Sequence, residues 1–181
     1  MSEQFEVLQT VTARLDQAEI PYMISGSMAM NYYAQPRMTR DIDIVLALVS
    51  SDADRLEELF AEDFYLDRES IQRAIMTDGM FNLIHFDYVA KVDFIVRKNS
   101  EYRRLEFSRR RRVEIEGQFL YMVSPEDLLL SKLEWGRETE SELQFRDIRN
   151  LIDSVIDLDW AYIQQWANSL GLRSLLERVR S

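Results

Sequence analysis

The stretch RDIDIVLAL, from Arg40 to Leu48, sets two carboxylates at the start of an apolar run. The run is rich in branched aliphatic residues, which favours a β-strand within a sheet. Side chains alternate along a strand, so Asp41 and Asp43 share one face and Ile42 and Ile44 share the other. An ionised carboxylate beside a core is costly unless it is paired, hydrogen-bonded or bound to a metal. This strand therefore predicts a functional site around Asp41 and Asp43.

A second predicted strand, KVDFIV at residues 91–96, carries a third candidate carboxylate. Alternation places Asp93 on one face with Lys91 and Ile95. If the two strands are neighbours, three carboxylates converge, and such crowding is tolerated when a divalent cation lies between them. A bare D-x-D pattern is too short to decide this alone, and by itself it favours the simpler explanation that each aspartate is a strand end or a solvent-facing residue.

The segment SGS at residues 25–27 lies between a predicted strand, PYMIS, and a predicted helix. Gly26 permits a tight turn, and Ser27 with the first amides of the helix can hold a phosphate. The alternative is a plain N-cap serine after a turn. A phosphate cradle together with metal-binding carboxylates predicts a nucleoside triphosphate site.

Composition limits the chemistry. The chain has 181 residues, no cysteine and one histidine, His85, so any metal must be held by oxygen ligands, which points to magnesium, manganese or calcium. The net charge of −10 argues against broad, non-specific binding of nucleic acid. We expect a cytoplasmic protein without a membrane partner, because no apolar run is long enough to cross a bilayer and MSEQFEVLQT is unlike a signal peptide.

The pattern of elements predicts an α+β fold, a mixed β-sheet flanked by helices. Helices are expected over residues 5–18, 26–34, 52–60, 69–77 and 100–111, and strands near 21–25, 42–48, 81–88 and 91–96, with a hairpin about Glu116-Gly117. From Ser124 onward all signals are helical, beginning with the capping sequence SPED. We expect a core over residues 1–122 and a C-terminal helical extension over 123–181, or one compact domain.

These residues resemble a known family. Gly26-Ser27, thirteen further residues, Asp41-Ile42-Asp43-Ile44 and then Asp93 after a valine resemble the signature of the polymerase-β-type nucleotidyltransferase superfamily. Within it, the run R-x-T-x-D-I-D is similar to the bacterial minimal nucleotidyltransferases and the AbiEii-type toxin group. SPEDLLLSKLEWGR and FRDIRNLID resemble the lysine-bearing helix and the R/K-D-x-x-D segment of that group. The similarity spans about residues 20–155.

The resemblance implies the nucleotidyltransferase fold and a role for each matching position. Ser27 would bind the β- and γ-phosphates, and Lys132 would steady the triphosphate. Asp147 would support the site. Asp41, Asp43 and Asp93 would hold Mg²⁺, or Mn²⁺, with Asp93 also helping to deprotonate the attacking hydroxyl.

The implied activity is transfer of a nucleoside monophosphate from a nucleoside triphosphate such as ATP to a hydroxyl acceptor. The acceptor could be an RNA end such as that of tRNA, a protein or a small molecule. The implied setting is a toxin-antitoxin or phage-defence system with a cognate antitoxin or toxin. The family often has a glycine before its arginine, whereas this chain has Ala34-Gln35-Pro36-Arg37, so neither Arg37 nor Arg40 is assigned a role.

Two other functions fit part of the pattern. A nucleotide-sugar glycosyltransferase also uses D-x-D with a metal but gives no reason for the Gly-Ser turn or the third aspartate. A non-catalytic nucleotide-binding antitoxin or regulatory partner remains an alternative. Among the other residues, we expect His85 to be a hydrogen-bonded strand histidine, Arg109–Arg112 to be a solvated helix end rather than a nucleic-acid site, and Trp135, Trp160 and Trp166 to pack the tail.

Overall fold

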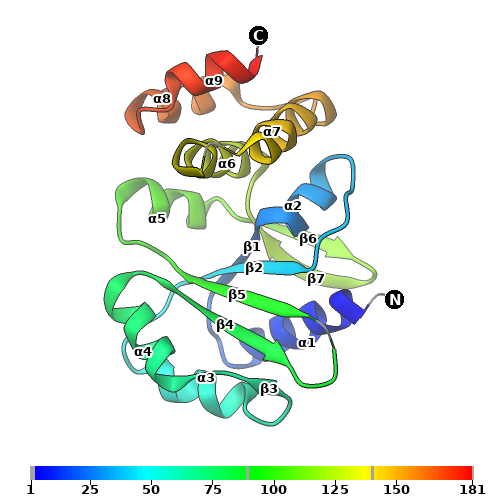
Figure 1. Ribbon diagram of the computed structural model, residues 1–181, viewed down its shortest axis with the longest axis vertical. Coiled ribbons are helices and arrows are strands. Elements are labelled where there is room, and N and C mark those ends of the chain that lie inside the picture. The colour runs from blue at the N-terminus through cyan, green and yellow to red at the C-terminus, as the bar shows by residue number, and fades with distance from the viewer. Residues whose placement is uncertain (1–2, 89, 140, 181) are drawn as a thin grey trace.

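A mixed β-sheet runs through the middle of the molecule (Figure 1). The computed structural model describes residues 3–88, 90–139 and 141–180. Within them the sheet has seven strands in the order β3-β4-β5-β2-β1-β7-β6. The strands are β1 (Tyr22–Ser25), β2 (Asp41–Leu46), β3 (Phe64–Tyr65), β4 (Met80–His85), β5 (Lys91–Val96), β6 (Arg111–Ile115) and β7 (Gln118–Met122).

Helices lie on both sides of this sheet. In Figure 1, α3 and α4 lie below it, and α6 to α9 form a layer above it. The helices are α1 (Glu3–Gln17), α2 (Gly26–Tyr33), α3 (Asp52–Phe60), α4 (Arg68–Thr77), α5 (Glu101–Ser108), α6 (Pro125–Thr139), α7 (Glu142–Ser154), α8 (Trp160–Ser169) and α9 (Arg173–Arg180). The expected α+β class, with a mixed sheet between helices, is confirmed.

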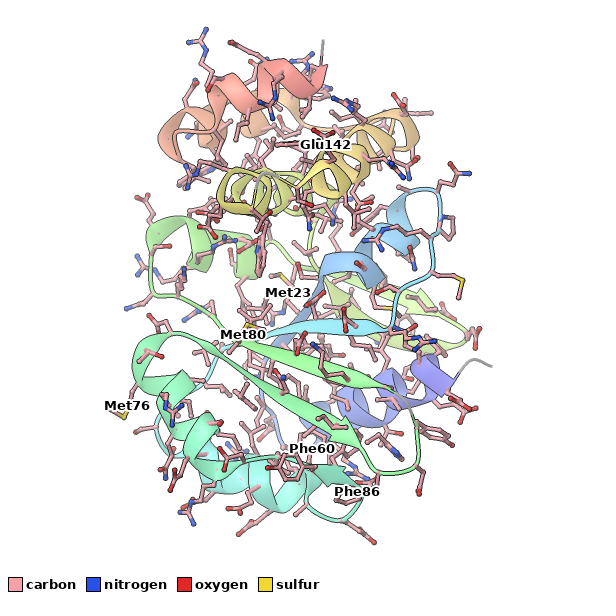
Figure 2. The ribbon with its side chains drawn as sticks, viewed as in Figure 1. Met23, Phe60, Met76, Met80, Phe86 and Glu142 are labelled. Atoms are coloured by element: carbon pink, nitrogen blue, oxygen red, sulfur yellow. The ribbon has the colours of Figure 1, made fainter. Side chains whose placement is uncertain are left out.

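The central strands are paired in a way that fixes the site. β2 pairs antiparallel with β1 and parallel with β5, and β5 pairs antiparallel with β4. Along β2 the burial alternates, so that Ile42 and Ile44 are fully buried on one face. That face is covered by packed aromatic side chains: the rings of Phe60 on α3 and Phe94 on β5 are 6.0 Å apart, and Figure 2 shows Phe60 among the side chains of the lower layer. The other face carries Asp41 and Asp43 on β2 and Lys91 and Asp93 on β5, followed on each strand by one aliphatic side chain.

The N-terminus of α6 follows its sequence signal. The Ser124 side chain accepts a hydrogen bond from the Asp127 amide at 3.1 Å and donates one to the Asp127 carboxylate at 2.6 Å. Asp127 is fully buried and also accepts from the hydroxyls of Tyr102 and Tyr162. This helix start is therefore anchored to α5 and α8 as well as capped.

The structure differs from the sequence prediction at two places. The helix expected over 100–111 ends at Ser108, and Arg111 already begins β6, because β6 pairs with β7 through a hairpin turn at Glu116 (φ +50°) and Gly117 (φ +81°). The two-residue strand β3, paired with the end of β4, was not predicted, because so short a segment carries no periodic signal. β7 ends at Met122, but the division into core and extension stays a prediction.

No helix in the described part of the chain is long and apolar enough to cross a membrane.

Candidate active site

The three aspartates lie on one face of two adjacent strands. β2 and β5 run parallel with Asp43 opposite Asp93 and Asp41 opposite Lys91. Asp41 is exposed, Asp43 is half-buried and Asp93 is 6% exposed. The pleat directs these carboxylates away from the core face, as strand alternation requires. The structure thus brings together aspartates that are 50 residues apart in sequence.

Burial and crowded negative charge together perturb this cluster. The pKa of Asp43 is raised, chiefly by burial and further by the charges of Asp93 and Asp41, while Lys132 and the backbone amide of Ser27 act in the opposite direction. The Lys91 ammonium lies 2.9 Å from Asp93 Oδ2 and 3.7 Å from Asp41 Oδ1. Its pKa is raised, mainly by the hydrogen bond to Asp93. One lysine therefore offsets part of the charge of three carboxylates.

Gly26 brings the start of α2 into contact with Asp43. Its φ of +58° is a left-handed conformation that glycine adopts without strain. A Cβ atom at this position would lie 1.9 Å from Asp43 Oδ2, so no other residue fits without movement of the aspartate. The turn also directs the Ser27 backbone amide toward the Asp43 carboxylate. The helix start expected from SGS is present and faces the carboxylate cluster.

Two cationic side chains, those of Lys132 and Arg37, contact the buried carboxylate of Asp147 next to Ser27. The Lys132 ammonium donates to Asp147 Oδ2 at 2.8 Å and to Gln144 Oε1 at 3.1 Å. The Arg37 guanidinium donates to both Asp147 oxygens at 3.2 Å and to Ser27 Oγ at 2.9 Å. Asp147 thereby holds both cations beside the serine that the sequence marks for phosphate.

The protonation of this network follows from its packing. Burial raises the pKa of Asp147, but the hydrogen bonds and charges of Arg37 and Lys132 outweigh that effect and lower it. The pKa of Lys132 is lowered, because burial outweighs its hydrogen bond to Asp147. Both Lys132 and Asp147 are nearly inaccessible, at 5% and 3% exposure. An anionic ligand entering here would find the cations already in position.

A cleft of about 370 Å³ joins these groups. Its walls include Gly26, Ser27, Arg37, Asp41, Asp43, Asp93, Lys132 and Trp135. A second hollow of about 240 Å³ adjoins it and shares Ser25, Met80, Ile95, Ser131 and Trp135 with it. A larger open hollow of about 580 Å³ lies between α8 and α9, where none of the candidate site residues is found. The chemistry is therefore concentrated in the first cleft.

The donor set of this cleft suits a hard divalent cation. All three candidate ligands are carboxylates, and Asp93 Oδ1 is buried without a hydrogen-bond partner. Among the residues that the structure describes, no three acidic or histidine side chains are yet gathered around one metal position. When bound, the cation would be held by Asp41, Asp43 and Asp93. The residues fit Mg²⁺ or Mn²⁺, and their convergence on a metal stays a prediction.

All seven candidate residues belong to one arrangement. Six line the cleft, and Asp147 reaches it through Lys132 and Arg37. Arg37 was not assigned from the sequence, although its place in R-x-T-x-D-I-D was the available signal; its contact with α7 depends on tertiary packing. Lys91 was placed on the correct face but given no role.

The structure tests the expectations for His85 and the three tryptophans. His85 Nδ1 accepts hydrogen bonds from the Asp87 and Tyr88 amides at 3.1 and 3.3 Å, which fits a structural histidine. The expectation that Trp135 packs the tail is wrong, because its side chain is 50% exposed and lines both hollows. Trp160 and Trp166 do pack against the core.

The run Arg109–Arg112 is neither an open basic patch nor simply solvated. Arg109 and Arg111 donate to the buried carboxylates of Asp127 and Glu126, each at 3.2 Å. The guanidinium of Arg110 lies 4.5 Å from the ring centre of Phe107, and that of Arg112 lies 3.8 Å from the ring centre of Phe119. These contacts use the cations to join secondary structure elements.

The fold defined by this sheet and cleft is that of nucleotidyltransferases, because several solved structures that superpose on most of the chain are nucleotidyltransferases or proteins like them. ANT(2″)-Ia in complex with adenylyl-2″-tobramycin has a TM-score of 0.64 and 14% identity, covering 99% of this chain and 100% of that one. An antigenic nucleotidyltransferase-like protein from Paracoccidioides brasiliensis has a TM-score of 0.61 and 20% identity over 98% of this chain and 92% of its own.

The lincosamide antibiotic adenylyltransferase LnuA, with lincomycin bound, has a TM-score of 0.58 and 13% identity, covering 86% of this chain and 99% of that one. No protein-family model matches the chain, and no curated protein matches its sequence significantly. The likeness therefore concerns the fold, and the activity must be inferred from the site.

Proposed function

We propose that this protein is a magnesium-dependent nucleotidyltransferase that moves a nucleoside monophosphate from a nucleoside triphosphate to a hydroxyl acceptor. The observation that carries the proposal is the parallel register of Asp43 and Asp93 directly beside the Gly26-Ser27 turn. One end of the cleft holds carboxylates for cations, and the other holds cations for phosphates. A nucleotide-sugar glycosyltransferase would leave the turn and the cation pair unexplained.

The residues divide the reaction between them. Ser27, the amides at the start of α2, Arg37 and Lys132 bind the β- and γ-phosphates, with Asp147 keeping both cations in place. Asp93, the most enclosed carboxylate of the three, receives the proton of the attacking hydroxyl. The hydroxyl oxygen then bonds to the α-phosphorus, and the bond to the leaving pyrophosphate breaks. Magnesium bound by the aspartates would supply stabilisation of the charge that develops on the transferring phosphoryl group.

The acceptor that we favour is a hydroxyl-bearing small molecule. The hollow of about 240 Å³ adjoins the cleft of about 370 Å³, so that the two together reach the size of a small-molecule pocket. The hollow begins where Ile95 follows Asp93 on the same strand face. A nucleic-acid acceptor such as tRNA has less support, because the Arg109–Arg112 cations are engaged within the fold and the net charge is −10. Two proteins that share the fold were solved with small molecules of this kind, ANT(2″)-Ia with adenylyl-2″-tobramycin and the lincosamide antibiotic adenylyltransferase LnuA with lincomycin.

Other settings stay untested predictions. A protein acceptor, a toxin-antitoxin or phage-defence role, and a cognate antitoxin or toxin all rest on the sequence resemblance. The non-enzymatic alternative, a nucleotide-binding regulatory partner, would use the same cleft to bind a nucleotide without transferring it.

A direct transfer assay tests the proposal. The protein is incubated with Mg²⁺ and each α-labelled nucleoside triphosphate, with hydroxyl-bearing small molecules including tobramycin and lincomycin, total RNA or cell lysate as acceptors. We expect label on a small molecule, and a loss of about 10²–10⁴-fold or more in Asp93→Asn. Label on RNA or protein would correct the acceptor class. A higher melting temperature with Mg²⁺ and a nucleotide, but no label transferred to any acceptor, would favour the regulatory partner.

A further inference from the structure

Lys91 lies where a cation is needed by the carboxylate cluster. Its ammonium is 2.9 Å from Asp93 Oδ2 and 3.7 Å from Asp41 Oδ1. The strand register sets Lys91 directly opposite Asp41, two residues before Asp93 on the same face. The side chain is 41% exposed, so its charged end can move into solvent without disturbing the core.

The ammonium of Lys91 occupies one of the two Asp93 oxygens and leaves the other without a partner. Asp93 uses Oδ2 for the ammonium, while Oδ1 is buried and has no partner. The described carboxylates are not gathered around a metal position. An ammonium is a compact single charge with three donors, and it can offset repulsion between carboxylates that a divalent cation would otherwise have to offset. The two Asp93 oxygens belong to one carboxylate, so a divalent cation on either of them would be strongly repelled by an ammonium held on Oδ2.

We propose that Lys91 is a built-in competitor for the divalent cation. Its ammonium offsets part of the negative charge of the aspartates in the free protein and must move away for the metal to bind. This exchange weakens binding of the metal alone, so that the cation is bound firmly when it arrives with the phosphates of the nucleotide. The proposal rests on the proposed function only in requiring that Asp41, Asp43 and Asp93 bind a divalent cation.

The competition has a measurable sign. Removing the ammonium takes away one positive charge within a few ångströms of the metal. One more carboxylate charge is thereby left uncompensated and available to attract the metal. Metal affinity should therefore rise about five- to thirtyfold, the range expected for close charges screened by partial exposure. A lysine that serves only as an ion pair for folding would instead leave metal affinity unchanged when it is removed. Removal of a lysine that contacts phosphate would instead weaken nucleotide binding.

The chain offers a matched control. Lys98 is exposed just beyond the end of β5 and can be replaced in the same way. Lys91→Met and Lys98→Met change the net charge equally and both keep an unbranched apolar stem. Lys91→Arg keeps the charge at the site, and Lys91→Gln provides a second neutral variant should the methionine variant fold poorly.

The experiment measures Mn²⁺ binding by electron paramagnetic resonance at fixed ionic strength, without nucleotide. We expect Lys91→Met and Lys91→Gln to bind Mn²⁺ about five- to thirtyfold more tightly than wild type, and Lys98→Met and Lys91→Arg to stay within about twofold of it. Wild-type affinity in the neutral Lys91 variants, or equal tightening in Lys98→Met, would overturn the proposal.

A second measurement separates this inference from the proposed function. Wild-type binding of Mn²⁺ together with nucleotide transfer, but without tightening in either neutral Lys91 variant, would overturn the role of Lys91 alone. Mn²⁺ binding with tightening but no transfer to any acceptor would support Lys91 and contradict the enzymatic proposal. Absence of Mn²⁺ binding by every variant, with or without nucleotide, would overturn both.

Discussion

Replacing Gly26 by alanine tests the contact between the turn and Asp43. Two costs add. Alanine at φ +58° adopts a left-handed conformation that costs roughly 1–2 kcal/mol. The new Cβ would also lie 1.9 Å from Asp43 Oδ2 and 2.7 Å from its Cγ, so the carboxylate must turn away and lose the Ser27 amide. A hydrogen bond to a charged group contributes about 1.5–3 kcal/mol, which brings the expected loss to about 2.5–5 kcal/mol.

Gly117 provides the control for backbone strain alone. It has φ +81°, and a Cβ there would meet nothing within 4 Å. Gly117→Ala should therefore cost about 1–2 kcal/mol in the free energy of unfolding, measured by urea denaturation at pH 7. Stabilisation by Mg²⁺ with a nucleoside triphosphate in thermal melts should persist in Gly117→Ala and be lost in Gly26→Ala, because Asp43 is displaced in the latter.

A double mutant shows whether Asp43 causes the difference. Asp43→Ala removes the two nearest atoms and leaves a Cβ 2.9 Å from the new methyl group. Combining it with Gly26→Ala should recover about 1 kcal/mol or more relative to the sum of the single mutants. Equal losses in Gly26→Ala and Gly117→Ala, with additive effects in the double mutant, would refute the steric coupling.

Three further changes test the charges and the exposed aromatic. Asp43→Asn should raise the melting temperature of the metal-free protein at pH 7, because the pKa of Asp43 is raised in the fold and its ionised form is destabilising. That gain should vanish as the pH falls below the ordinary value of 3.8, where Asp43 is protonated; a gain that is the same at all pH values would contradict it. Asp147→Asn should cost about 3–5 kcal/mol at pH 7 by leaving Lys132 buried without its carboxylate. Because the pKa of Asp147 is lowered, that loss should fade in urea titrations only as the pH falls through 3.8 and below, and a loss that persists in acid would count against the ion pair. Trp135→Ala should cost less than half as much unfolding free energy as Trp166→Ala, since Trp135 is 50% exposed and the Trp166 ring packs 5.0 Å from that of Tyr102; equal losses would show that Trp135 is a core residue.

The sequence determined the local elements and the faces of the strands. The alternation in DIDI and KVDFIV was enough to place Asp41, Asp43 and Asp93 on the non-core faces, because side-chain direction in a strand has a period of two. The glycine and serine at 26–27 likewise indicated a turn into a helix, and Ser124 with Asp127 indicated the start of another. These are properties of a few consecutive residues, so the chain itself carries them.

Tertiary structure decided which of those residues meet. Strand order and register place Asp43 beside Asp93, and neither can be read from the periodicity of one strand. The packing of α6 and α7 brings Lys132 and Asp147 to Arg37, and the same packing leaves Trp135 exposed at the cleft although its helical spacing resembles that of a core residue. The sequence predicts a helix end at residues 109–112. In the fold, Arg111 and Arg112 belong to the β6–β7 hairpin, and Arg109 and Arg111 bind carboxylates at the start of α6. Such contacts join segments distant in sequence, and they depend on the free energy of the whole packed fold rather than on local preference.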